Sequence, residues 1–168
     1  LGIVWIGLLG SFAALILRWS NLFGGNSLGT DTLFLVVLGV VANDIGALAV
    51  GSAIGRTPLR AWISPAKTVE GLLGGALATM ASMVVFHLVG RSDTWTELSD
   101  LLILGVAISV MAPLGDLTES MFKRNLDVKD FGTLLSGHGG VLDRFDAFLF
   151  TLPVTYYLSM VLLDINFF

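Results

Sequence analysis

Long apolar runs separated by short polar segments dominate the chain. A helix that crosses the hydrocarbon core of a bilayer needs about 20 mostly apolar residues. Five stretches approach that length, namely residues 1–17, 33–54, 69–89, 98–114 and 145–163. Glycine is frequent within them, which suits close contact between helices in lipid. The pattern predicts an all-α protein, a polytopic membrane helical bundle with about five transmembrane helices.

Composition supports a membrane protein and excludes some other classes. Hydrophobic residues make up 55% of the chain and charged residues only 13%, whereas soluble domains carry about 25% charged residues. The net charge of −4 argues against nucleic acid as a partner. Cysteine is absent, so a metal would be held by oxygen or imidazole. Because Leu1 already lies within an apolar run, we expect a single membrane-embedded domain over residues 1–168 that lacks upstream helices.

The basic residues predict an orientation in the membrane. Seven of the nine Lys and Arg residues fall between the second and third stretches or between the fourth and fifth. The remaining two, Arg18 and Arg91, fall in the other connections. Cytoplasmic loops of membrane proteins carry an excess of Lys and Arg, so the two long loops are expected to face the cytoplasm.

Carboxylates gather in the polar segment 116–146. Asp116 follows the fourth apolar stretch, and Asp143 and Asp146 lie three apart where the fifth begins, so a helix would place both on one face. Acids at such depth usually face a cavity or a partner. Convergent carboxylates suit Mg²⁺, which binds one or two of them together with substrate phosphates. Simple pairing with Arg144 and Lys129, or a solvated loop, would explain the same charges.

Other polar groups suit the binding of phosphate. Gly139 and Gly140 follow His138, and glycines let the backbone approach an anion closely. Ser64, Lys67 and Thr68 precede a helix that is expected to begin near residue 70. At such a helix start, the helix dipole, the Thr68 hydroxyl and the Lys67 ammonium can bind a phosphate together. His138 fits an ordinary loop histidine equally well. Asp44, midway through the second stretch, is either a functional carboxylate or a hydrogen-bonding partner of a neighbouring helix.

These residues also form a pattern of known type. The defined positions are Ser120, Phe122, Lys123, Arg124, Lys129, Asp130, Gly132, Leu135, Ser136, 138–141 and 143–146. They resemble the signature of the phosphatidate cytidylyltransferases (CDP-diacylglycerol synthases). The segments 115–120 and 64–71 are similar to the same family, although Ala66 stands where the family usually has Lys.

The resemblance implies a membrane-embedded nucleotidyltransferase of phospholipid biosynthesis. It would transfer CMP from CTP to phosphatidate at the cytoplasmic face of a bacterial inner membrane, as a homodimer in the lipid bilayer. Magnesium, as one or two ions, would be held by Asp116, Asp143 and Asp146, and the family allows a monovalent cation beside it. Lys67 would act with these acids in catalysis. Substrate contacts would come from Asp44, Ser64, Thr68, Lys123, Arg124, Lys129, His138, Gly139, Gly140 and Arg144.

Two rival functions remain open at this level. Another CTP-dependent lipid enzyme, such as a CDP-archaeol synthase or a polyprenol kinase, would need the same chemistry. A cation or proton transporter would use Asp44 and Asp116 as intramembrane acids, but it leaves the phosphate-suited loops unexplained. A CDP-alcohol phosphotransferase is disfavoured because its pattern begins with Asp-Gly, and that pair does not occur in the chain.

Overall fold

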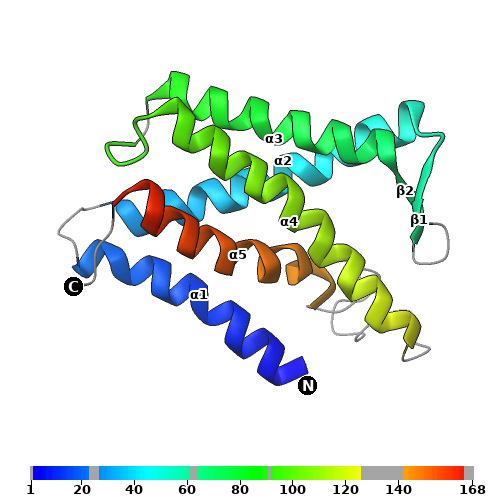
Figure 1. The fold of residues 1–168 in the computed structure, drawn as a ribbon, viewed down its shortest axis with the longest axis horizontal. Coiled ribbons are helices and arrows are strands. Elements are labelled where there is room, and N and C mark those ends of the chain that lie inside the picture. The colour runs from blue at the N-terminus through cyan, green and yellow to red at the C-terminus, as the bar shows by residue number, and fades with distance from the viewer. Residues whose placement is uncertain (1, 23–26, 61–63, 91, 126–141, 165–168) are drawn as a thin grey trace.

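Five helices make up most of the chain (Figure 1). The computed structural model describes residues 2–22, 27–60, 64–90, 92–125 and 142–164, apart from the side chains of residues 2–6, 20–22, 60, 64–66 and 142–145. The helices are α1 (Gly2–Leu22), α2 (Leu28–Ile54), α3 (Val69–Val89), α4 (Leu98–Asn125) and α5 (Leu142–Leu162). The predicted all-α fold with five helices is confirmed.

The helices have the dimensions of an integral membrane protein. Within the described residues, α2, α3 and α4 are each long and apolar enough to cross a membrane. α1 and α5 carry shorter apolar stretches, Gly7–Trp19 and Asp146–Leu162. Large hydrophobic side chains are exposed along the outer faces, and Leu48, Leu77 and Leu88 are each more than 70% exposed. Such faces are stable in lipid, where no polar cover is needed.

Helix α4 continues well beyond its predicted end. The apolar run stops at Leu114, yet the helix reaches Asn125 and contains Pro113. Hydropathy reports which part of a helix lies in the hydrocarbon, whereas the helix itself continues through good helix formers such as Glu119 and Lys123. Asp116 therefore follows the apolar run but lies inside the helix and not at its end.

A short β-hairpin, which the sequence did not predict, connects α2 to α3. Strand β1 (Pro58–Arg60) pairs antiparallel with β2 (Ser64–Thr68), with Pro58 opposite Thr68 and Arg60 opposite Ser64. The hairpin projects from the same end of the bundle as the C-terminal end of α4 (Figure 1). Lys67 of the hairpin and Lys123 and Arg124 in the last turn of α4 therefore lie at one end of the molecule.

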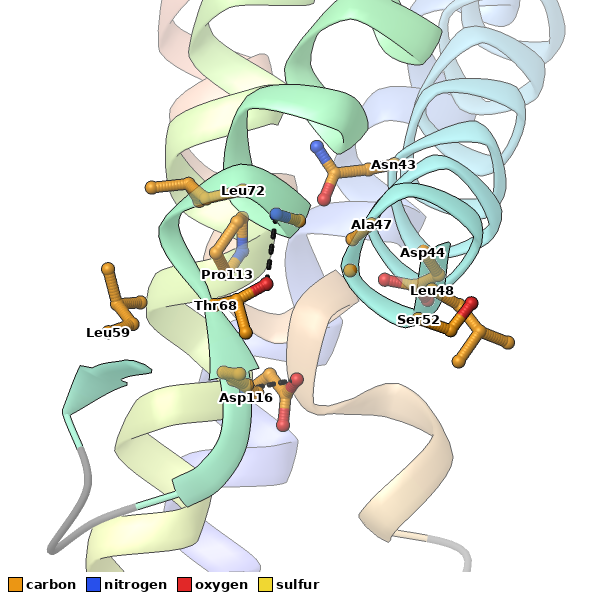
Figure 2. Close-up of a pocket in the computed structure, with 13 residues that line it drawn as sticks. Asn43, Asp44, Ala47, Leu48, Ser52, Leu59, Thr68, Leu72, Pro113 and Asp116 are labelled. Atoms are coloured by element: carbon orange, nitrogen blue, oxygen red, sulfur yellow. Dashed lines mark hydrogen bonds and ion pairs between the residues drawn. The ribbon is translucent and has the colours of Figure 1, made fainter. Parts of the chain in front are cut away.

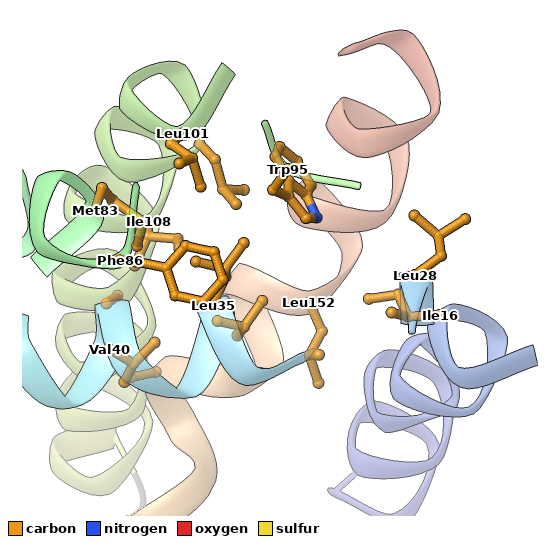
Figure 3. Close-up of a cluster of buried hydrophobic side chains, with 14 of the residues drawn as sticks. Ile16, Leu28, Leu35, Val40, Met83, Phe86, Trp95, Leu101, Ile108 and Leu152 are labelled. Carbon is orange, nitrogen blue, oxygen red and sulfur yellow. The ribbon is translucent and has the colours of Figure 1, made fainter. Parts of the chain in front are cut away.

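The hydrophobic core draws on all five helices, and Ile16 and Trp19 come from α1 (Figure 3). Its fully buried aliphatic side chains come from successive turns of different helices, and they include Leu35, Val40, Met83, Leu101 and Ile108. α1 packs on the other side of α5, where Trp19 stacks on Tyr156 with ring centroids 5.0 Å apart.

A carboxylate fastens the end of the bundle opposite the hairpin. Asp31, in the first turn of α2, accepts hydrogen bonds from Ser27 (2.9 Å) and Ser92 (2.5 Å). Trp95, also in the connection between α3 and α4, donates its indole N–H to Thr32 at 3.0 Å. These bonds tie the α3–α4 connection to the start of α2.

Buried polar groups fix the contact between α2 and α3. The Asn43 amide donates to Thr79 Oγ1 at 3.3 Å, and the Thr79 hydroxyl in turn approaches the Gly39 and Gly75 carbonyls at 3.2 and 3.0 Å. The helices come this close because Gly75 has no side chain: a Cβ there would lie 2.8 Å from the Asn43 carbonyl oxygen. That oxygen belongs to the backbone and cannot turn away.

We therefore expect Gly75→Ala to destabilise the protein. The extra methyl must push α2 from α3 or strain the backbone, which costs about 1–3 kcal/mol in a packed interior. Thermal unfolding in detergent, followed by size-exclusion chromatography, measures the loss. Gly7→Ala is the matched control, because a Cβ at position 7 of α1 meets nothing within 4 Å. Equal stability of the two variants would contradict the close approach at Gly75.

Candidate functional site

A cavity of about 450 Å³ lies at the hairpin end of the bundle. It is bounded by α2, the hairpin, the start of α3, and α4 (Figure 2). One part of its wall is charged or polar, with Asp44, Ser52, Lys67, Thr68 and Asp116. The rest is largely apolar and includes Ala47, Leu48, Leu59, Leu72 and Pro113.

Three carboxylates converge at the charged end of this region. Asp116 and Glu119 are three residues apart on α4, and Asp146 lies near the start of α5. One carboxylate oxygen from each can be chosen so that all three lie within 4.8 Å of one another. Glu119 and Asp146 are only 2% and 7% exposed. Carboxylate oxygens at such spacing are the ligand type that a hard divalent cation takes.

Close packing of α4 on α5 brings the acids together. A Cβ at Gly115 would lie 2.6 Å from the Asp146 carbonyl oxygen, so only glycine allows the two backbones to approach this far. The neighbour of Gly115 in the chain is Asp116, which is thereby brought beside the start of α5. The Asp146 carboxylate also accepts a hydrogen bond from the Ala147 backbone N–H at 2.6 Å, which limits its rotation.

Lys67 reaches this cluster from the other half of the molecule. Its ammonium forms an ion pair with the Asp116 carboxylate, drawn as a dashed line in Figure 2. Lys67 is the next-to-last residue of β2, and Thr68 then caps α3 by accepting a hydrogen bond from the Gly71 N–H at 3.1 Å. The cap uses an acceptor lone pair of the Thr68 hydroxyl, whose proton can still be donated to a ligand in the cavity.

A second lysine adjoins the acids from α4 itself. Lys123 lies one turn beyond Glu119, and its ammonium is 3.2 Å from a Glu119 carboxylate oxygen. The carboxylates of Asp116 and Glu119 thus each face one ammonium, while the side chains that line the cavity leave room for an anion beside them. This arrangement can bring a cation and a polyanion to the same place.

Several predicted site residues lie in or beside this region. Asp44 and Thr68 line the cavity together with Lys67 and Asp116. Arg124 is exposed in the last turn of α4. Ser64 begins β2, but its side chain is outside the described part of the structure.

Other predicted residues lie beyond the described part. The backbone of α5 places Asp143 and Arg144 in its first turn, without a description of their side chains. Lys129, His138, Gly139 and Gly140 fall in residues 126–141, which are outside the described ranges. The predicted convergence of Asp143 with Asp116 therefore stays a prediction.

The site residues predicted above do not include Glu119, Ser52 or Asn43. Glu119 nevertheless belongs to the acidic cluster. Its spacing of three from Asp116 is the signal for a shared helix face, but that signal applies only if the helix continues past residue 114. Ser52 and Asn43 both line the cavity from α2.

Comparison with known proteins gives one consistent family. The sequence model of the cytidylyltransferase family matches residues 2–162. A phosphatidate cytidylyltransferase from Bacillus subtilis is 42% identical over 130 residues, covering 77% of this chain and 48% of the relative. A phosphatidate cytidylyltransferase from a Synechocystis species is 46% identical over 124 residues, covering 74% of this chain and 41% of the relative. One from Staphylococcus saprophyticus is 39% identical over 155 residues, covering 92% of this chain and 58% of the relative. The chain thus spans about half the length of the curated relatives it matches.

The crowding of acids predicts an unusual effect on stability. We expect Asp146→Asn to leave stability unchanged or raise it by up to about 1 kcal/mol in metal-free buffer, because repulsion among like charges falls. The asparagine oxygen can still accept the Ala147 N–H. Thermal unfolding in EDTA measures the change, with Asp93→Asn in the exposed α3–α4 connection as the matched change of charge. A large loss of stability specific to Asp146→Asn would contradict net repulsion at the cluster.

Proposed function

The chain belongs to the cytidylyltransferase family, and from that premise we propose that it transfers CMP from CTP to phosphatidate, yielding CDP-diacylglycerol and pyrophosphate. The relatives named above carry the name of this activity. The observation that carries the proposal is the ion pair of Lys67 with the acidic cluster at the charged end of a cavity whose other wall is apolar. Phosphatidate has the same division, with a charged phosphate and two acyl chains.

The reaction needs charge control more than it needs a protein nucleophile. An oxygen of the lipid phosphate attacks the α-phosphorus of CTP, a new P–O bond forms, and the bond from the α-phosphorus to the leaving pyrophosphate breaks. The attacking phosphate is already anionic, so no hydroxyl or thiol has to be activated. Two polyanions must nevertheless approach each other, and catalysis of this kind consists mainly of positioning and electrostatic stabilisation.

The acidic cluster fits a magnesium site. Asp116, Glu119 and Asp146 supply oxygen ligands only, and two of them are nearly fully buried. We assign magnesium to this cluster, with Asp143 joining it from the first turn of α5. When bound, the ion would neutralise charge on the triphosphate. The acids would hold and orient it, and the tight α4–α5 contact at Gly115 keeps their spacing fixed.

We assign Lys67 to contacts with both substrates. Its ammonium lies against Asp116 at the cavity wall, so an incoming phosphate meets a positive charge where the carboxylates would otherwise repel it. The Thr68 hydroxyl, next in the chain, can donate to a phosphate oxygen. Lys123 and Arg124 lie at the end of α4 for the same purpose. The remaining basic and glycine contacts are assigned to Lys129, His138, Gly139, Gly140 and Arg144.

The apolar wall is assigned to the lipid. Leu48 on α2 is 74% exposed and also lines the cavity, so the cavity wall is continuous with a surface suited to acyl chains. Phosphatidate can then enter from the bilayer while CTP enters from water. The hairpin and the end of α4, with most of the basic residues, lie at one end of the bundle (Figure 1), which we assign to the cytoplasmic face of a bacterial inner membrane. Assembly as a homodimer is part of the proposal.

We expect the complete purified protein to incorporate labelled CMP from CTP into phosphatidate in the presence of Mg²⁺, and EDTA to abolish turnover. Asp116→Asn and Asp143→Asn should each lower kcat by roughly 100-fold or more, the scale seen when a preorganised electrostatic group is removed. Extraction of the labelled lipid into organic solvent measures the product. An ether-linked phosphatidate in a parallel reaction tests the class of lipid.

Asp93→Asn serves as the control, because it removes the same charge at the opposite end of the bundle and should retain activity. Undiminished turnover by Asp116→Asn would overturn the assignment of the cluster. Undiminished turnover by Asp143→Asn alone would remove only that residue from the site.

A further inference from the structure

Glu70 makes a set of contacts that the proposed reaction does not use. It lies in the first turn of α3, and its carboxylate turns back to the connection between α2 and β1. One oxygen accepts the backbone N–H groups of Arg56 (3.2 Å) and Thr57 (3.1 Å), and the other accepts the Thr57 hydroxyl (2.9 Å). The Val69 N–H donates to the Thr57 carbonyl at 2.9 Å, so four bonds join these two short segments. We call these four hydrogen bonds the Glu70 clamp.

The clamp closes the base of the hairpin. Pro58 pairs with Thr68 as the first rung of the β1–β2 ladder, and Thr57 and Val69 are the residues one step outside that rung. The described residues between them, including Lys67, extend from the clamp. A two-stranded hairpin is only marginally stable by itself, and these strands have three and five residues. The position of the Lys67 backbone therefore depends on the clamp.

Glu70 does not itself line the cavity, whereas Lys67, Thr68 and Leu59 all do. Its oxygens are already occupied by three donors, so it is not oriented to bind a cation or a substrate. A glutamate in the first turn also interacts favourably with the helix dipole, but that effect requires no bond to Arg56 or Thr57. The geometry of the three bonds points to a mechanical role.

We propose that Glu70 is a positioning residue that holds the hairpin so that Lys67 meets Asp116 and the reacting phosphates. The inference rests on the proposed cytidylyl transfer. Glu70 would not touch the substrates itself: it fixes the base of the hairpin, the hairpin fixes Lys67, and Lys67 contacts the phosphates.

The test compares Glu70→Ala with Glu70→Gln in the complete protein. Glutamine can keep all three bonds, since its oxygen accepts the two N–H groups and its NH₂ group donates to the Thr57 hydroxyl. We expect Glu70→Ala to lower kcat/KM for CTP by roughly tenfold to 100-fold, the scale of a misplacement of about 1 Å. Glu70→Gln should stay within about threefold of the native value, because shape and not charge is required.

A second pair of variants separates positioning from general stability. If Glu70 acts through Lys67, Glu70→Ala should cost less than about threefold once Lys67→Met is present, because coupled residues are not additive. Equal losses in the two backgrounds would overturn the inference, as would native kinetics in Glu70→Ala. Hydrogen exchange provides a readout besides activity: the amides of Arg56, Thr57 and Val69 should exchange faster in Glu70→Ala than in Glu70→Gln.

The two proposals fail in different ways. Absence of CMP transfer by the native protein would overturn the proposed function and, with it, the catalytic role of the clamp. Normal transfer by the native protein together with unchanged exchange and unchanged kinetics in Glu70→Ala would overturn the inference about Glu70 alone.

Discussion

The ion pair between Lys67 and Asp116 joins two helix pairs that also share one hydrophobic core. On one side, α2 and α3 are held together by the buried Asn43–Thr79 contact and by the close approach at Gly75. On the other, α4 and α5 meet at Gly115, where the acids converge. The Lys67 ammonium comes from the first pair and the three clustered acids from the second, so their ion pair forms only where the two pairs come together. Packing between the helices therefore sets the distance between these opposite charges.

The convergence of acids is costly for the fold. Burial of Glu119 and Asp146 removes water from two carboxylates, and their proximity to Asp116 adds repulsion. Ammonium groups from Lys67 and Lys123 offset part of that cost. A protein selected for stability alone would place apolar side chains at these positions. The cluster is thus the kind of local conflict that persists where a bound cation or substrate compensates for it.

The sequence predicted the helices well and their connections poorly. Apolar runs of about 20 residues are a strong signal, so all five helices were located, and Lys67, Asp44 and Asp116 were placed in one site. Hydropathy does not detect a helix that continues outside the hydrocarbon. The shared helix face of Asp116 and Glu119 on α4 was therefore not predicted. The hairpin was missed because three-residue and five-residue strands leave no periodicity to detect. The contacts of Glu70 join residues 13 and 14 apart through a turn, and no local pattern reports such a bond.

The apolar wall of the cavity has a consequence for competing ligands. Leu48 belongs both to the cavity and to the outer surface of α2, so one side of the chamber opens toward acyl chains while the other carries fixed charge. A water-soluble nucleotide analogue would make no contact with the apolar wall, and a neutral lipid would provide no anion for the Lys67 ammonium. Effective inhibitors that bind this cavity should be small amphiphiles, with a compact anionic group and a short alkyl chain. Their potency should then depend on how they partition into the membrane as much as on how they fit.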